Sequence, residues 1–236
     1  MSWVRLPVDP IRRAIILTEA ANKSLVMLGA GGHARVLQEI LAEQGATLSG
    51  YLAPTSEGAV VDAIWLGADE NLSQFNPGEI LLVNGLGSAS SMGIRRKVYE
   101  AARAQGFSFR SVVDENAIIR SSSTLGAGAQ IMPGAIIGSG VSIGNNVLIN
   151  TGAIVDHDVS IGAHTHISVA AAIGGQASVG ESTHVGLGAR IIQGVTVGSH
   201  CTVGAGAVVI RDVPDGSVAV GVPATLRPIN QQREDN

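Results

Sequence analysis

The sequence is dominated by a six-residue repeat that runs without interruption from residue 113 to residue 214. Every sixth residue from Val113 to Val209 is Val, Ile or Leu, and the residue four positions after each of these is never larger than Val. A period of six does not fit an amphipathic helix, which needs apolar residues about every 3.6 positions, and it is longer than the alternation of a single strand. The repeat therefore predicts a parallel β-helix of short strands and tight turns.

Three six-residue units would form one triangular coil, so residues eighteen apart in the sequence should stack on one another. The large aliphatic residues are expected to point inward and form a long, narrow core, with the small residues beside them. Gly commonly follows the aliphatic residue directly, as at Gly126, Gly144 and Gly162. We expect these glycines at the corners, where they would adopt the positive φ that a tight turn requires.

The composition narrows the class of protein. Aromatic residues make up only 3% of the 236 residues, which suits a thin interior, and the net charge of −4 comes with no basic stripe for a nucleic acid. The single cysteine, Cys201, excludes a disulfide within the chain and a cysteine-based metal site. No apolar run approaches the length of a membrane span, and the N-terminus lacks a signal-peptide pattern. We expect a cytoplasmic protein.

The residues before the repeat have a different pattern. Residues 1–22 form an N-terminal extension without a functional interpretation. Apolar runs at 24–28, 47–52 and 80–83 predict strands, and helices are expected from about residue 34 to Gly45 and from about Arg95 to Gly106. This alternation predicts a small parallel Rossmann-like α/β domain over residues 23–110. The β-helix domain should cover 111–228, and a polar tail 229–236.

A glycine-rich segment, Gly29-Ala30-Gly31-Gly32-His33, joins the first expected strand to the first helix. Backbone N–H groups and the helix dipole at such a junction favour an anion, and Gly lets a phosphate approach closely. The acidic residue that would bind the ribose of NAD about 20 residues later is absent, because residues 49–54 read Ser-Gly-Tyr-Leu-Ala-Pro. The segment thus favours a phosphate ligand and argues against hydride transfer.

One histidine of the repeat stands out from the others, most of which are expected to be uncommitted surface residues. His157 lies between Asp156 and Asp158, and both Asp156 and Asn150 occupy the position after the aliphatic residue where Gly is common. A carboxylate that hydrogen-bonds an imidazole fixes its tautomer and raises its basicity, which suits a general base. We interpret this corner as a candidate catalytic site.

Taken together, these motifs resemble a known family. The six-residue pattern is similar to that of the hexapeptide-repeat acyltransferases, and the order GAGGHA, short α/β domain, Asn-Thr, Asp-His-Asp and Gly-Val-Pro-Ala resembles the NeuD/PglD/PerB-type sugar O/N-acyltransferases over residues 24 to about 228. The resemblance, and not the spacing, implies a left-handed β-helix, against the usual right-handed crossover. It also implies a trimer that transfers an acetyl group from acetyl-CoA to a nucleotide-linked amino sugar for surface-glycan biosynthesis.

The resemblance assigns roles to individual residues. His157 would be the general base, Asp158 its orienting partner, and Asn150 would lie near the sugar. The N–H of Gly175, one coil above His157, would stabilise the thioester oxygen. Further expected contacts are those of acetyl-CoA with His166, Leu187 and Ala205, and those of the nucleotide sugar with Gly31, Gly32, His33 and Gly87. Ala53 and Pro54 replace an Asp that is common in the family, which leaves the sugar and the nucleotide open.

Other functions are compatible with parts of the pattern. A sugar O-acetyltransferase of the sialic-acid type and a non-catalytic scaffold that binds a nucleotide sugar are the alternatives. The trimeric zinc carbonic anhydrases share the repeat, but they need a His-x-x-x-x-His pair and a third His, and this sequence has no such pair. We therefore expect no metal. Flat, weakly charged prism faces would leave apolar surface exposed, which favours its burial against another chain; the resemblance implies that the assembly is a homotrimer.

Overall fold

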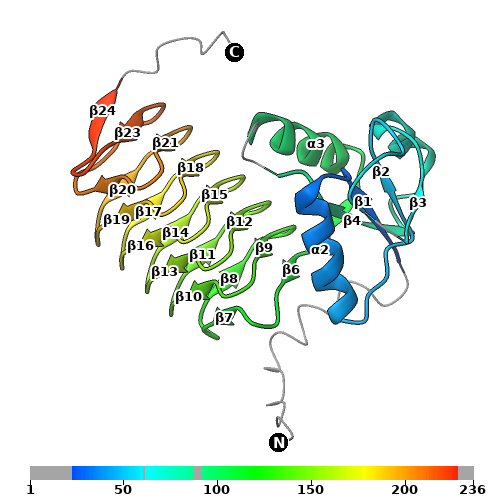
Figure 1. The fold of residues 1–236 in the computed structure, drawn as a ribbon, viewed down its shortest axis with the longest axis horizontal. Coiled ribbons are helices and arrows are strands. Elements are labelled where there is room, and N and C mark those ends of the chain that lie inside the picture. Colours follow the sequence, from blue (N-terminus) through cyan, green and yellow to red (C-terminus); the bar gives the residue numbers. More distant parts are fainter. Residues whose placement is uncertain (1–22, 61, 88–91, 228–236) are drawn as a thin grey trace, which may run out of the picture.

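The computed structural model describes residues 23–60, 62–87 and 92–227 (Figure 1). The expected N-terminal extension and the polar tail lie outside these residues. A small α/β domain is followed by a long β-helix. The short strands of the β-helix stack from β6 to β23, and β24 lies at its C-terminal end. Within the described residues no helix has both the length and the hydropathy needed to cross a bilayer.

The N-terminal domain is a parallel five-stranded sheet with the order β3-β2-β1-β4-β5. Because β1 lies at the centre, with β2 on one side and β4 on the other, the loops after β1 and β4 meet at the carboxyl edge of the sheet. The predicted Rossmann-like domain is thereby confirmed, although its second strand begins at Gly50 and not at Thr47. Its elements are β1 (Ser24–Leu28), α2 (Gly32–Glu43), β2 (Gly50–Leu52), β3 (Ile64–Trp65), η1 (Asp69–Gln74), β4 (Ile80–Asn84), α3 (Met92–Ala104) and β5 (Ser108–Phe109).

The C-terminal domain is a left-handed β-helix whose strands form three parallel faces. Residues eighteen apart are paired, as in Ile136↔Ile154↔Ala172. The first face contains β6 (Val112–Val113), β9 (Gln130–Ile131), β12 (Leu148–Ile149), β15 (His166–Ile167), β18 (His184–Val185) and β21 (Thr202–Val203), and it is continued by β23 (Val218–Val220) and the antiparallel β24 (Thr225–Arg227). The second face contains β7 (Ile118–Ile119), β10 (Ile136–Ile137), β13 (Ile154–Val155), β16 (Ala172–Ile173), β19 (Arg190–Ile191) and β22 (Val208–Val209). The third face contains β8 (Thr124–Leu125), β11 (Ser142–Ile143), β14 (Ser160–Ile161), β17 (Ser178–Val179) and β20 (Thr196–Val197).

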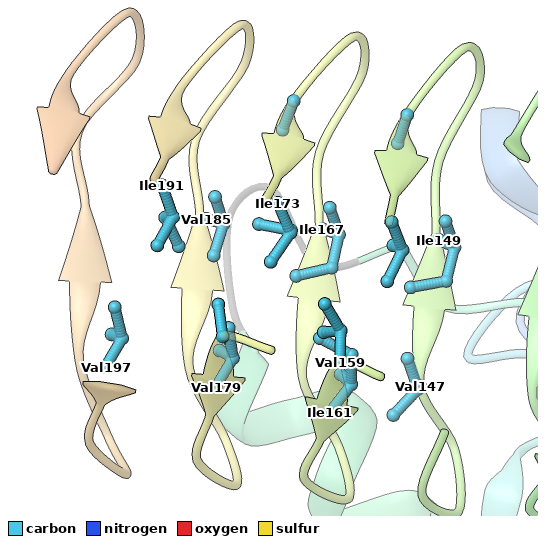
Figure 2. Packing of buried hydrophobic residues seen from close by; sticks show 14 of the residues in the cluster. Val147, Ile149, Val159, Ile161, Ile167, Ile173, Val179, Val185, Ile191 and Val197 are labelled. Atoms are coloured by element: carbon cyan, nitrogen blue, oxygen red, sulfur yellow. The ribbon is translucent and has the colours of Figure 1, made fainter. Parts of the chain in front are cut away.

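The inward side chains are those that the six-residue period predicts. Figure 2 shows the aliphatic residues of successive coils stacked inside the prism, among them Ile149, Ile167 and Val185, each with 0% exposure. Small side chains such as Ala153 and Ala171 complete the same core. Burial of each Val or Ile contributes roughly 1.5–3 kcal/mol, so the repeat supplies the stability of the domain directly.

The expected role of the glycine after each aliphatic residue is wrong. Positive φ falls two residues later, for example at Gly128, Asn146 and Asp158, and none of the glycines directly after the aliphatic residue has it. Those glycines are instead needed for close stacking of coils. A Cβ on Gly162 would lie 2.5 Å from the backbone N of Glu181 in the next coil, a distance that real Cβ atoms do not reach.

The two domains share a hydrophobic core along the first face. Val112, Met132 and Leu148 of the β-helix pack in one cluster with Met27 and Leu37 of the N-terminal domain. Figure 1 shows the N-terminal domain seated at the start of the β-helix, with α2 beside β6 and α3 above the first face. The carboxyl edge of the parallel sheet is therefore held against the coils.

Candidate active site

The turn between β13 and β14 places His157 at the corner between the second and third faces. His157 Nδ1 lies 3.0 Å from Asp158 Oδ2, and the His157 N–H donates to Asp156 Oδ1 at 2.7 Å. Because a carboxylate only accepts, Nδ1 carries the proton in this pair and the lone pair of neutral His157 is on Nε2. The side chain of His157 is 54% exposed, so a substrate can reach it.

The electrostatics of this corner favour a basic imidazole. The hydrogen bond to Asp158 raises the pKa of His157, and the negative charges of Asp156 and Asp158 act in the same direction. Asp158 adopts φ of 58°, a left-handed conformation that Asp tolerates better than most residues. The turn thus holds a carboxylate beside the imidazole while it leaves Nε2 open.

Gly175 lies one coil above His157, as predicted. Gln176 N–H donates to the His157 carbonyl at 2.9 Å, which fixes the two turns together. A Cβ on Gly175 would lie 2.6 Å from His157 Nε2 and 2.8 Å from Cε1, so the absence of a side chain is what lets the ring occupy its place. Among the described residues no acceptor takes the Gly175 N–H.

A second polar group, formed by Asn150, His166 and His184, occupies the first face and its adjoining corner. Asn150 Nδ2 lies 3.1 Å from His166 Nε2, and the rings of His166 and His184 are 4.9 Å apart. His166 is 4% exposed, and burial, followed by the charges of His184 and Arg95, lowers its pKa to about 3. The structure brings Asn150 and His166 together, but their hydrogen bonds do not connect them to His157.

The other residues expected to contact acetyl-CoA lie along a different edge from Gly175. Leu187 and Ala205 stack at the corner between the first and second faces, and Leu187 O accepts the Gly206 N–H at 2.8 Å. The side chain of Leu187 is 58% exposed. The two edges bound the second face, whose outward side chains include the exposed Ile136 and Ile154.

In the N-terminal domain the four predicted substrate residues converge. Gly31 caps α2 without a side-chain hydrogen bond, and the first turn of α2 has no acidic residue. A Cβ on Gly31 or Gly32 would meet no atom within 4 Å, whereas a Cβ on Gly87 would lie 3.6 Å from the Cβ of His33. The N-terminus of α2 therefore presents free backbone donors to an open space, as a phosphate site requires.

A buried polar network next to this turn was not anticipated. Asn84, Arg95, Gln130 and Asn146 are between 0% and 2% exposed and link the end of β4, α3 and the first face of the β-helix. Gln130 also lies 2.8 Å from His33. Asn84 at the end of a buried strand was the one visible signal, because polar residues at the carboxyl ends of parallel strands commonly face a ligand. Nothing in the repeat distinguished Gln130 from other outward positions.

The arrangement gives no sign of a resident metal. Across residues 23–60, 62–87 and 92–227, no group of three or more His, Cys, Asp or Glu side chains is positioned to hold a metal ion. The site combines an oriented imidazole, a glycine of the next coil packed against it and a separate turn with free backbone N–H groups. Such a combination suits acyl transfer, in which a base deprotonates the acceptor and an N–H stabilises an oxyanion.

Comparison with known proteins agrees with this chemistry. Residues 24–102 match the family model of the PglD N-terminal domain, and residues 116–151 match that of the bacterial transferase hexapeptide repeat. Among solved structures, the acetyltransferase domain of PglB from Neisseria gonorrhoeae, in complex with acetyl coenzyme A, is 34% identical, with 88% of this chain and 100% of that chain covered and a TM-score of 0.81. PerB from Caulobacter crescentus, in complex with CoA and GDP-perosamine, is 38% identical, with 88% and 98% covered and a TM-score of 0.80. No curated protein sequence matches the chain.

The fold and the site define a hexapeptide-repeat acyltransferase. The identities and the nearly complete coverage place it more narrowly. The chain belongs to the family of PglD/PerB-type sugar acyltransferases, as its sequence motifs predicted.

Proposed function

We propose that this protein is an acetyl-CoA-dependent N-acetyltransferase that acts on a nucleotide-linked amino sugar. The observation that supports the proposal is the pair formed by His157 and Gly175, in which an Asp-oriented imidazole packs with its Nε2 against the glycine of the next coil. The related structures, which contain acetyl-CoA or CoA with GDP-perosamine, support the choice of donor and acceptor.

The reaction follows from the protonation states at the corner. Nε2 of neutral His157 takes a proton from the acceptor amine while the amine nitrogen attacks the carbonyl carbon of the thioester. Asp158 accepts the Nδ1–H and stabilises the imidazolium that forms. The Gly175 N–H faces the carbonyl oxygen while it carries negative charge, and the C–S bond then breaks. His157 returns its proton to the CoA thiolate, which leaves as the thiol.

The acceptor is held at a distance from the base, by the turn before α2. The diphosphate would accept hydrogen bonds from the free N–H groups at the N-terminus of α2, with Gly31 and Gly32 giving it room and Gly87 closing the opposite side. Ala53, which follows β2, offers no carboxylate to a ribose or base.

The decisive experiment replaces His157. His157→Ala should lower kcat by about 10²–10⁴-fold in a thiol-release assay with acetyl-CoA and a panel of UDP-, GDP- and dTDP-linked amino sugars, because general-base catalysis contributes that much. His200→Ala is the matched control, since His200 is an exposed histidine on another corner of the β-helix. Near-normal turnover by His157→Ala would refute the mechanism, and no turnover of any amino sugar by the wild type would refute the proposed reaction.

We further propose that the active form is a homotrimer. His157 and Gly175 lie at one edge of the second face, whereas Leu187 and Ala205 lie at the other. Packing of neighbouring chains would bring the first edge of one chain against the second edge of the next, and it would also cover the exposed isoleucine side chains between them.

The second face provides the test of assembly. The side chain of Ile154 on β13 is 44% exposed. Its replacement by Asp should be tolerated in a monomer, where the side chain faces water, but not in an interface between chains. Ile154→Asp is expected to dissociate the trimer and abolish activity, as measured by light scattering and thiol release. Ser160→Asp, an exposed position on β14 of the third face, is the control and should do neither. A wild-type protein that is fully active as a monomer would contradict the proposal.

A further inference from the structure

The side chain of Gln130 in the β-helix contacts three elements of the N-terminal domain. It is fully buried on β9. Its Nε2 donates to the Asn84 carbonyl at 2.7 Å, and its Oε1 accepts from Arg95 Nη2 at 3.1 Å. The same Oε1 lies 2.8 Å from His33 Nε2. Gln130 thereby connects the end of β4, α3 and the first turn of α2.

These contacts determine the orientation of the amide and the tautomer of His33. Arg95 can only donate and the Asn84 carbonyl can only accept, so Oε1 and Nε2 of Gln130 cannot be exchanged. Because Oε1 is an acceptor, His33 Nε2 must carry a proton. In the part of the chain that the structure describes, no side chain or backbone group pairs with His33 Nδ1, and this atom is not among the buried side-chain polar atoms that lack a partner.

The surroundings also keep His33 neutral. Burial and the positive charge of Arg95 on α3 lower its pKa to about 4, against a smaller opposite effect of the hydrogen bond to Gln130. The other titratable group facing it is His166 on the first face, which is itself neutral because its pKa is lowered to about 3. No described carboxylate forms an ion pair with Arg95. His33 therefore carries one proton, on Nε2, at neutral pH.

We propose that Gln130 is a positioning residue for the nucleotide-sugar subsite: it holds His33 as the neutral Nε2–H tautomer, so that Nδ1 accepts a hydrogen bond from a hydroxyl or amine group of the substrate. The inference rests on the proposed function. The backbone N–H groups of α2 already supply donors for the diphosphate. His33 adds the opposite chemistry, an acceptor, which selects for a donor group on the sugar or ribose next to the diphosphate.

Gln130→Glu is the informative variant. Its carboxylate would form an ion pair with the buried guanidinium of Arg95, which has no carboxylate partner among the described residues. It would lose the hydrogen bond that Gln130 Nε2 donates to the Asn84 carbonyl. The Asn84 carbonyl keeps the Arg95 Nη1 donor at 3.2 Å. The same carboxylate would raise the pKa of His33, and protonation would turn Nδ1 from an acceptor into a donor.

Steady-state kinetics then separate positioning from a structural role. At pH 7 Gln130→Glu should raise KM for the nucleotide sugar about tenfold, leave KM for acetyl-CoA unchanged and keep kcat within about twofold, because one hydrogen bond is lost and the His157 corner is untouched. The KM should fall again as the pH rises and His33 loses its proton. Gln105→Glu, an exposed change directly after α3 that adds the same charge, should have none of these effects.

The state of His33 can be read independently of turnover. A nitrogen-15 spectrum of the imidazoles in the free wild-type protein should show His33 protonated on Nε2 alone, with no change down to about pH 5. A proton on Nδ1 at pH 7, or an unchanged nucleotide-sugar KM in Gln130→Glu alongside normal wild-type turnover, would overturn the inference and leave the proposed function intact. Absence of wild-type turnover would overturn the proposed function and the substrate contact, and the spectrum would still decide the tautomer.

Discussion

Substitution of Gly175 by Ala tests the geometry of the catalytic corner most directly. The new Cβ would lie 2.6 Å from His157 Nε2, 2.8 Å from Cε1 and 3.0 Å from Cδ2. Carbon and nitrogen atoms pack at about 3.5 Å, so the ring must retreat by about 1 Å. His157 is an exposed side chain and can do so, at the cost of its alignment with Asp158. A misplacement of about 1 Å lowers kcat by about a hundredfold.

The same change should leave the fold intact. Gly175 does not adopt positive φ, so Ala is sterically allowed in its backbone conformation, and the clash involves only a mobile ring. We expect the free energy of unfolding in urea to change by no more than about 1 kcal/mol. Gly174→Ala is the contrasting neighbour. Its Cβ would meet the backbone N of Gln193 at 2.5 Å, and that variant should lose stability.

A double-mutant cycle supplies the refutation. If Gly175→Ala acts by displacing the imidazole, it should have no further effect on the residual rate of His157→Ala. Equal losses in both backgrounds would show that the glycine acts independently of the histidine. A Gly175→Ala enzyme with kcat within about twofold of wild type would refute the close approach of the two residues.

Two further predictions concern protonation. Asp158→Asn should lower kcat and move the acid limb of the kcat/KM profile to lower pH, because the hydrogen bond that raises the pKa of His157 is weakened; an unmoved limb would contradict the assigned base. The lowered pKa of His166 should make the fold sensitive to acid, because the unfolded chain binds a proton below about pH 6.5 and the folded chain does not until about pH 3. Between pH 7 and pH 5 wild type should therefore lose about 2 kcal/mol more than His166→Gln in urea titrations, and equal losses would contradict the burial of a neutral imidazole.

The β-helix was predictable because its signal is local and repeated. Each inward Val or Ile repeats every six residues, and this period fixes which side chains form the core without any long-range information. The same period does not reveal which of the turn residues takes the left-handed conformation. That is why Gly162 was assigned the wrong role. A side chain is excluded at this position by the backbone of Glu181 in the next coil and not by the φ of Gly162 itself.

The geometry of the corner at His157, where we propose that catalysis occurs, was predictable for a similar reason. His157 and Asp158 are adjacent in the sequence, and Gly175 follows at one coil length, so the spacing alone brings them together. The network around Gln130 was not predictable, because Gln130 meets His33 across 97 residues through the docking of one domain on another. The burial of His166 beside Asn150 also depends on that docking, since the first face is the one that the N-terminal domain contacts.

The core that both domains share has a consequence for substrate choice. Met132 and Leu148 pack in one buried cluster with residues of α2 and β1. This packing fixes the position of the turn before α2 relative to the β-helix, so the turn cannot move toward His157. In the function that we propose, a nucleotide-linked acceptor would have to span the fixed distance between this turn and His157. We expect the nucleotide diphosphate to bind at the turn and thereby to position the sugar at His157. A free amino sugar lacks this contact, so it should be turned over poorly even if its amine fits the site.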